Sequence, residues 1–306
     1  MLFKGLALGA FALAATATTG CAGEPLSSTK KQVEIRYVTP ISVCRMKLAP
    51  VGNPTRAGTA VRDLDPAQWL EVMVPGYDEA KGIDPTALDC TGNYVFANES
   101  LRGGASDRGW PRIVDPDEVV INSGPNGMRV VWLRALKFPN GEEGGPLALA
   151  RAYGDNAEIY SLGSFRGPKN ARFQTARIGN ETIVVAETKE CDPETETCRK
   201  RAMFFLPRAG RLIEAATVDL ERVTTVPSTT QRGLYTMYKL TTDVTYTKEG
   251  ILLLEQMQVR IVKTEVPDLD SDRELRTVEF ERFLKVERDT LFSSYEPLWE
   301  RVVGRD

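Results

Sequence analysis

Apolar and polar positions alternate along most of this chain, which is the pattern expected of half-buried β-strands. From residue 119 onward, short alternating runs follow one another, separated by turn-forming Gly, Asn and Asp residues. We expect strands at 119–122, 128–138, 147–153, 157–164, 171–178, 182–190, 199–207 and 211–219. Short strands at this spacing predict a mainly β fold of antiparallel sheets, arranged as a sandwich, a barrel or a propeller-like set.

Longer alternating segments follow a Thr/Pro/Ser-rich link at 224–231. In 234–246, apolar side chains share one face and polar side chains share the other, and the alternation continues through Met257–Ile261 and Val278–Val286. The last segment also fits helical spacing, through residues such as Phe283. We favour three long antiparallel strands.

A few short helices complete the predicted fold. Asp65 is a good N-cap, Pro66 suits the first helical position, and Gln68 lies three residues after the cap. Pro75 should end this helix. The rest of 40–118 reads as irregular, and a short closing helix is predicted at 297–303.

The first 21 residues have the features of an export signal. Lys4 precedes an apolar stretch from Leu6 to Ala17, which is too short to span a bilayer comfortably. Thr18, Thr19 and Gly20 then lead to Cys21.

This run resembles the lipobox of a bacterial lipoprotein, although Leu is typical where Thr18 stands. The resemblance covers residues 1–22 only. It implies that Cys21 becomes the lipidated first residue of the mature chain, and Ala22 points to the outer membrane. The alternatives are cleavage after Ala17, which gives a secreted or periplasmic protein with a free thiol, and an uncleaved anchor.

Four cysteines remain, Cys44, Cys90, Cys191 and Cys198, and an exported protein favours disulfides. Four cysteines allow three pairings. Cys191 and Cys198 bracket a predicted hairpin tip and suit a disulfide with each other, which leaves Cys44 to join Cys90. The alternative of a four-Cys zinc site lacks the usual closely spaced Cys pairs.

The pattern divides the chain into four parts. Residues 1–20 form the signal peptide, and 21–31 hold the lipidated Cys and a polar tether. Residues 32–223 form a β-rich domain with an irregular N-terminal part. Residues 232–306 form the long antiparallel meander, which we expect to pack on the same domain.

Composition narrows the functions that this chain can perform. Its 39 Lys and Arg residues against 42 Asp and Glu residues give a formal net charge of −3, which argues against nucleic-acid binding. The absence of His removes every mechanism that needs an imidazole. We expect no cofactor.

The sharpest candidate for a metal site is the acidic run that contains Asp268, Asp270 and Asp272. Carboxylates at alternate positions, with Glu279 at the twelfth, resemble a calcium-binding EF-hand loop. Arg273 stands where that loop needs Gly, and no amphipathic helix precedes it. A polar hairpin tip is therefore the favoured interpretation.

The leading hypothesis is a non-enzymatic lipoprotein of the cell envelope, a binding or structural module held to a membrane by its N-terminal lipid. Its partner would be an envelope protein or a hydrophobic ligand. One alternative is a carrier of a hydrophobic ligand such as a lipid, since three long strands with one apolar face can curve around an acyl chain. A further alternative is a hydrolase that acts on envelope polysaccharide through two carboxylates.

Overall fold

The computed structural model describes residues 41–49, 62–77, 83, 87–95, 110–111, 114–191, 197–263 and 273–304. The chain divides into two units, Met1–Val38 and Thr39–Asp306, and every described residue belongs to the second. Cys21, the tether, the predicted strand start at residue 32 and the acidic run at 268–272 lie outside the described residues.

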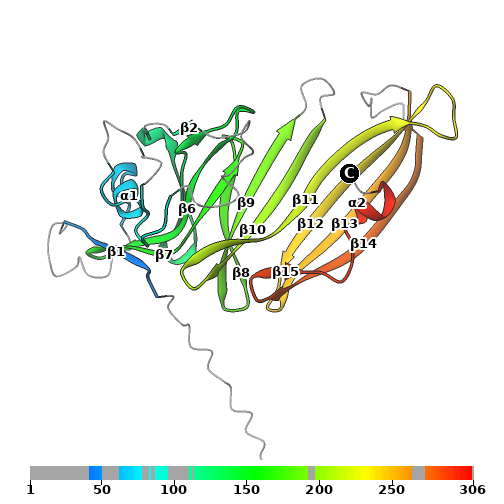
Figure 1. Cartoon of the computed structure of the whole chain (residues 1–306). Helices are drawn as coiled ribbons and strands as arrows, with labels where there is room; N and C mark the ends of the chain where they lie inside the picture. The colour runs from blue at the N-terminus through cyan, green and yellow to red at the C-terminus, as the bar shows by residue number, and fades with distance from the viewer. Residues whose placement is uncertain are drawn as a thin grey trace, which may run out of the picture. The chain divides into compact units, whose positions relative to one another are not determined.

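The described part is mainly β, as predicted (Figure 1). Its strands are β1 Cys44–Lys47, β2 Trp110–Pro111, β3 Val119–Ser123, β4 Met128–Leu133, β5 Leu136–Lys137, β6 Glu143–Tyr153, β7 Asn156–Gly167, β8 Arg172–Ile178, β9 Glu181–Cys191, β10 Cys198–Arg208, β11 Arg211–Pro227, β12 Tyr235–Tyr246, β13 Gly250–Val262, β14 Arg273–Glu287 and β15 Thr290–Phe292. Its α-helices are α1 Pro66–Met73 and α2 Leu298–Val302, and η3 Pro116–Glu118 and η4 Pro125–Gly127 are single 3₁₀ turns.

These strands form one continuous sheet rather than separate blades. Its main path runs β15-β14-β13-β12-β11-β7-β6-β4-β3, and β10, β9 and β8 branch from β11. The branch arises because β11 changes partner along its length. Its first part pairs with β10 as far as Glu221, and its last part pairs with β12 from Glu221 to Pro227. Neighbouring strands are antiparallel except at a single parallel contact, Arg211 with Leu162.

The branch folds into a middle layer between two other parts of the sheet. Consecutive residues Val184 and Val185 on β9 point to opposite sides and belong to different hydrophobic clusters. Val184 packs with Trp132 and Phe165 of β4 and β7. Val185 packs with Ile251 and other residues of β13 and β14. Both faces of the β8–β10 layer are therefore buried.

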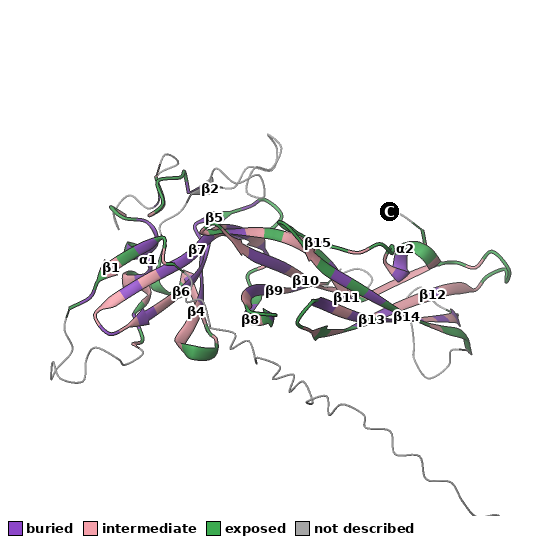
Figure 2. Cartoon of the chain, turned by 90° about the horizontal axis from the view of Figure 1, so that it is seen from below, coloured by how far each residue is buried: buried purple, intermediate pink, exposed green. Residues whose placement is uncertain are grey.

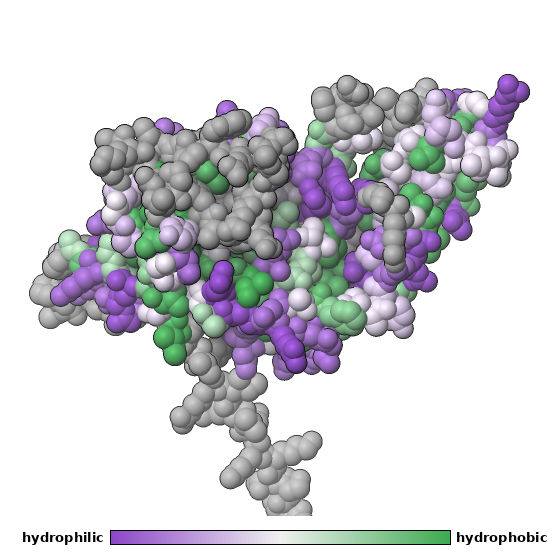
Figure 3. Space-filling view, in the orientation of Figure 1, coloured by the Kyte–Doolittle hydropathy of each residue, from purple (hydrophilic) through white to green (hydrophobic). Residues whose placement is uncertain are grey.

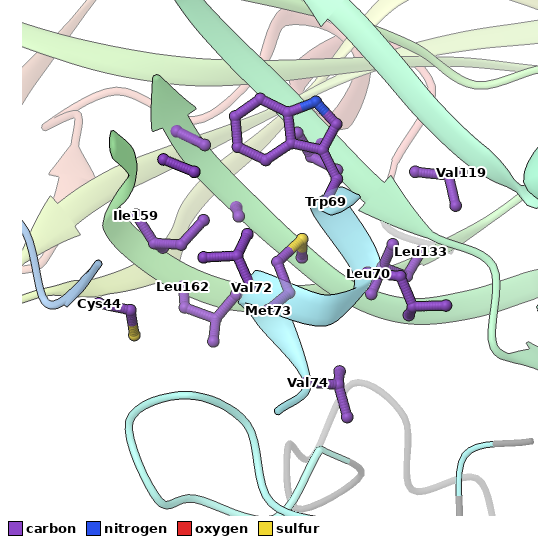
Figure 4. Close-up of a cluster of buried hydrophobic side chains, with 14 of the residues drawn as sticks. Cys44, Trp69, Leu70, Val72, Met73, Val74, Val119, Leu133, Ile159 and Leu162 are labelled. Atoms are coloured by element: carbon purple, nitrogen blue, oxygen red, sulfur yellow. The ribbon is translucent and has the colours of Figure 1, made fainter. Parts of the chain in front are cut away.

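Helix α1 covers the other face of β4, β6 and β7. Asp65 caps it through the predicted capping box, and the helix ends at Met73, two residues before Pro75. Trp69 and Met73 are buried in one hydrophobic cluster with Ile159 of β7 (Figure 4). Asp115 stands at the N-cap of the single turn η3.

The strand boundaries around β4 and β6 differ from the sequence-based prediction. The expected strand at 128–138 is interrupted after Leu133, and β6 begins at Glu143, four residues before the predicted start. The Gly-Gly-Pro run at 144–146 lies between the predicted strands. Gly145 instead lies in the sheet with φ of 154°, and a side chain there would lie 2.0 Å from the Leu133 carbonyl oxygen. A glycine is required because the backbones approach so closely.

The three long antiparallel strands are confirmed as β12, β13 and β14. We call the face that meets β8–β10 and α2 the inner face, and the opposite face the outer face. Val244, Leu253 and Arg282 form one row of the inner face, and Thr245, Leu252 and Phe283 form one row of the outer face. Burial alternates along these strands accordingly (Figure 2).

Candidate functional site

The outer face of β13, β14 and β15 carries a groove of about 390 Å³. We call it the outer groove, and its lining residues are Leu252, Glu281, Phe283, Lys285, Glu287, Phe292, Ser294 and Tyr295. Phe283 and Phe292 come from neighbouring strands. Tyr295 follows β15, and its ring meets Phe280 edge-on with ring centroids 5.7 Å apart. The strand pairing brings Phe283 and Phe292 to the same face, and the ring contact holds Tyr295 at the neighbouring edge of β14.

These apolar side chains are unusually exposed for their size. Phe292 is 53% exposed, Tyr295 61% and Phe283 37%, and Leu254 beside them is 41% exposed. A single exposed apolar residue needs no explanation, but a contiguous group marks a surface that binds something. The outer groove is therefore the strongest candidate site in the described part of the chain.

The rim of the outer groove is mainly acidic. Glu281 and Glu287 line it together with a single cation, Lys285. The acidic character continues along the same face, where Glu279 accepts a hydrogen bond from the Gln256 amide at 2.8 Å. Such a rim favours a cationic partner and disfavours an anionic one.

The inner face of the same strands is already occupied by the protein itself. Leu240, Met257 and Val259 pack under Trp299 of α2. Further along, Ile251 and Leu253 pack against β8–β10. The apolar faces that suggested a lipid carrier are thus covered by other parts of the same chain.

A buried ion pair anchors α2 to this inner face. Arg282 donates to Oε1 of Glu255 from Nη2 at 2.6 Å and from Nε at 3.1 Å. Oε2 of Glu255 accepts the backbone amide of Leu298 at 3.0 Å, at the start of α2. Both oxygens of a carboxylate that is only 1% exposed therefore have donors.

A second set of charges surrounds a cavity of about 180 Å³ beside α2. Arg199 donates to both oxygens of Asp219, at 2.7 and 3.0 Å. The guanidinium of Arg222 stacks over the Trp299 ring at 4.0 Å and lies 3.5 Å from Asp219. These side chains pair with each other, and the arrangement stabilises the point where β11 leaves β10.

Further ion pairs lie towards the ends of β9 and β10, where hydrophilic side chains gather on the surface (Figure 3). Lys200 lies 3.1 Å from Glu187, and Arg201 pairs with Glu190. These contacts tie the two strands together close to the Cys191–Cys198 neck, and they account for much of the local charge.

A cleft of about 610 Å³ lies beside α1 and η3. Its lining carboxylates include Asp65, which caps α1 by accepting the amide of Gln68 at 2.8 Å. Tyr77 also lines the cleft, and its hydroxyl accepts a hydrogen bond from the Val114 amide at 3.1 Å. These polar groups fix the ends of short elements, which is a structural use.

Two tyrosines are held in their neutral form. Burial, together with the hydrogen bond to Glu158, raises the pKa of Tyr160 to about 12. Burial and the nearby charge of Glu187 raise the pKa of Tyr246 to about 12 as well. A tyrosine of this kind is a poor base at neutral pH, and both side chains belong to the packed part of the sheet.

The residues predicted from sequence have mixed outcomes. Cys44 bonds to Cys90 and Cys191 bonds to Cys198, which confirms both disulfides. Cys21, and the metal candidates Asp268, Asp270 and Asp272, lie outside the described residues. Within the described ranges, no group of three or more Cys, Asp or Glu residues is placed to hold a metal ion.

The outer groove itself was not foreseen, although the sequence carries a signal for it. Phe283 stands on the face of β14 that otherwise holds Glu279, Glu281 and Lys285. Phe283 therefore interrupts the polar pattern of that face, but it indicates a binding surface only together with Phe292 and Tyr295, which the fold brings beside it. Because Phe283 also fits helical spacing, the sequence alone did not place it on the polar face of a strand.

Comparisons with known proteins identify no relative of this chain. No family model, no curated protein and no solved structure matches this chain. Among the helices in the described part, none is long and apolar enough to cross a membrane.

Proposed function

We propose that this chain is a cell-envelope lipoprotein that acts as a binding module. An acyl chain on Cys21 holds it to a membrane, in the outer membrane by the character of its signal, and the outer groove docks a partner protein. The observation that carries the docking proposal is the exposure of Phe283, Phe292 and Tyr295 around one groove.

The chemistry of the groove indicates what kind of partner it takes. Phenylalanine and tyrosine side chains supply large apolar contact area at interfaces, and the tyrosine hydroxyl stays hydrated at the rim. Glu281 and Glu287 favour Lys or Arg beside the apolar anchor. The partner is therefore a protein segment that combines apolar and basic side chains. An anionic lipid surface would be repelled by the same rim.

Binding is a better proposal than catalysis because of how the charged residues are used. Glu255 and Arg282 anchor α2, Asp219 joins two arginines, and Asp65 caps α1. The carrier alternative loses its motivating surface, since α2 and β8–β10 cover the inner face. Of the carboxylates beside α1, Asp65 serves as the helix cap, which leaves the hydrolase alternative with less support.

The anchor is tested by the intact mass of the protein extracted from bacterial membranes, measured with and without reduction and alkylation. We expect a mature chain that starts at Cys21 and carries lipid, with four further thiols that appear only on reduction. A chain that starts at Thr18 without lipid would overturn the lipoprotein assignment and make this a secreted protein.

The docking surface is tested by site-specific photo-crosslinking in the native membrane. A photoreactive phenylalanine analogue replaces Tyr295, and the matched control replaces Tyr94, which is 59% exposed elsewhere on the molecule. We expect a discrete protein adduct from position 295 and not from position 94. The identified protein, once purified, should bind the wild type and lose affinity for the Phe292→Ser variant.

Three results would overturn the docking proposal. The first is the same adduct from both positions, which would indicate random collision. The second is an adduct at position 295 with lipid alone, which would make the groove a membrane contact. The third is a purified adduct protein that binds the wild type and the Phe292→Ser variant equally well.

A further inference from the structure

The strand that carries the outer groove has an incomplete edge. β13 pairs with β14 from Arg273 to Lys285 on one side. On the other side, β15 pairs with β14 only from Lys285 to Glu287. Along residues 273–284, this second edge has no strand partner within the described part of the chain.

An open edge of this length is a template for another strand. Its backbone N–H and C=O groups point outward, and an extended segment of another chain can bond to them. Leu275 is 50% exposed, and its neighbours Glu274, Arg276 and Thr277 are exposed too. β14 contains no proline that would block such pairing.

The side chains along this edge alternate in chemistry. Glu279 and Glu281 stand on the outer face, whereas Val278 and Phe280 stand on the inner face. In a sheet, side chains directly opposite each other on neighbouring strands interact, and opposite charges or apolar pairs are the favourable combinations. An added strand would therefore place basic residues on the outer face and apolar residues on the inner face.

We infer that the partner segment binds as an extra β-strand on the free edge of β14, with basic and apolar residues in alternation. This inference rests on the proposed docking function and specifies how that docking occurs. Tyr295 lies where the edge meets the outer groove, since its ring contacts Phe280 and it lines the groove with Phe283. An apolar residue at the end of the added strand would enter the outer groove beside Tyr295.

A second copy of this chain is a poorer occupant of the same edge. Two copies related by a two-fold axis would pair β14 with itself in antiparallel orientation. Centred on Glu279, that pairing sets Glu279 opposite itself, and centred on Phe280 it sets Glu279 opposite Glu281. Like charges directly opposite each other are destabilising.

The inference is tested with short synthetic peptides that alternate Arg and Val, titrated into the full-length protein by calorimetry. Two versions carry N-methyl groups on alternate amides, one on each edge of the peptide strand. Only one edge can bond to β14, so we expect one version to lose affinity about tenfold or more and the other to bind like the parent. A peptide with Glu in place of Arg should not bind.

Charge reversal gives the matching test on the protein side. Glu281→Lys should weaken binding of the Arg-Val peptide about tenfold, because one favourable pair becomes a repulsive one. Glu71→Lys is the control, since Glu71 is an exposed carboxylate on α1. Both variants should unfold at the temperature of the wild type.

Several results would overturn strand addition. Equal binding of both methylated peptides, no binding of the parent peptide, or no effect of Glu281→Lys would each do so. A wild-type protein that sediments as a dimer through this edge would assign the edge to a second copy. If a protein adduct still forms at position 295 in these cases, docking in the groove stands and only strand addition fails.

Discussion

Arg282 and Glu255 form an ion pair within the mainly apolar inner face of the sheet, with Nη2 and Oε1 2.6 Å apart. Both side chains are buried, at 7% and 1% exposure. Because Glu255 also accepts the Leu298 amide, this one carboxylate joins β13, β14 and α2. The pair fixes the C-terminal segment at the edge where we place the docking surface.

Glu255→Ala should destabilise the protein by about 3–5 kcal/mol, because it leaves Arg282 buried without a counter-charge. Urea denaturation followed by circular dichroism measures the loss. The matched control is the double variant Glu255→Leu with Arg282→Met, which replaces both charges by apolar side chains and should restore most of the stability. A single variant as stable as the wild type would show that the pair is hydrated in solution.

The alternation of the sequence identified the inner face of β14 but not this ion pair. Position 282 falls on the same face as Val278 and Phe280 by spacing alone. Its partner is 27 residues away, on β13, and the contact depends on the register of the two strands. Register is set by side-chain packing and turn geometry together, so a single strand pattern does not reveal it.

The branching of the sheet could also not be predicted from the sequence. Residues 224–227 read as the start of a link because they are rich in Thr and end in Pro, yet they continue β11 and pair with β12. Thr and Val favour strands, and Pro227 lies at the last position, where its missing N–H costs little. The burial of β8–β10 on both faces depends on contacts between distant segments, which local patterns do not contain.

The two disulfides should contribute unequally to stability. Cys44 and Cys90 are 46 residues apart, whereas Cys191 and Cys198 are 7 apart. On the loop-entropy model the longer loop contributes about 4 kcal/mol and the shorter about 2.5 kcal/mol. Paired Cys→Ala variants of each disulfide, compared by urea denaturation, measure the difference. Equal losses would mean that packing around Cys44 and Cys191, rather than loop length, decides the contribution.

Stability should fall at alkaline pH through the two shifted tyrosines. Tyr160 and Tyr246 have pKa values of about 12 in the folded state against an ordinary value of 10. The unfolded chain therefore releases these protons first, so the stabilisation is complete below pH 10 and is lost as pH rises to about 12. Urea denaturation across this range should show a shallower loss for Tyr246→Phe and for Tyr160→Phe than for the wild type. Variants with the same pH profile as the wild type would contradict the assignment.

Phe283 and Leu284 provide the most direct test of the outer groove, because they are adjacent on β14 and point to opposite faces. Leu284 is 2% exposed in the inner core, so Leu284→Ala should cost about 2–5 kcal/mol. Phe283 is 37% exposed, so Phe283→Ala should cost less, about 1–2 kcal/mol.

The order of the two variants should be reversed for docking, where Phe283→Ala should have the larger effect. Phe283→Ala removes an apolar anchor from the groove and should reduce the protein adduct formed at position 295, although the fold is intact. Leu284→Ala should leave that adduct unchanged at temperatures well below its lowered melting temperature. Crosslink yield and thermal denaturation measured on the same samples separate the two effects. A Phe283→Ala variant that unfolds like Leu284→Ala would place Phe283 in the core and remove the basis for the docking surface.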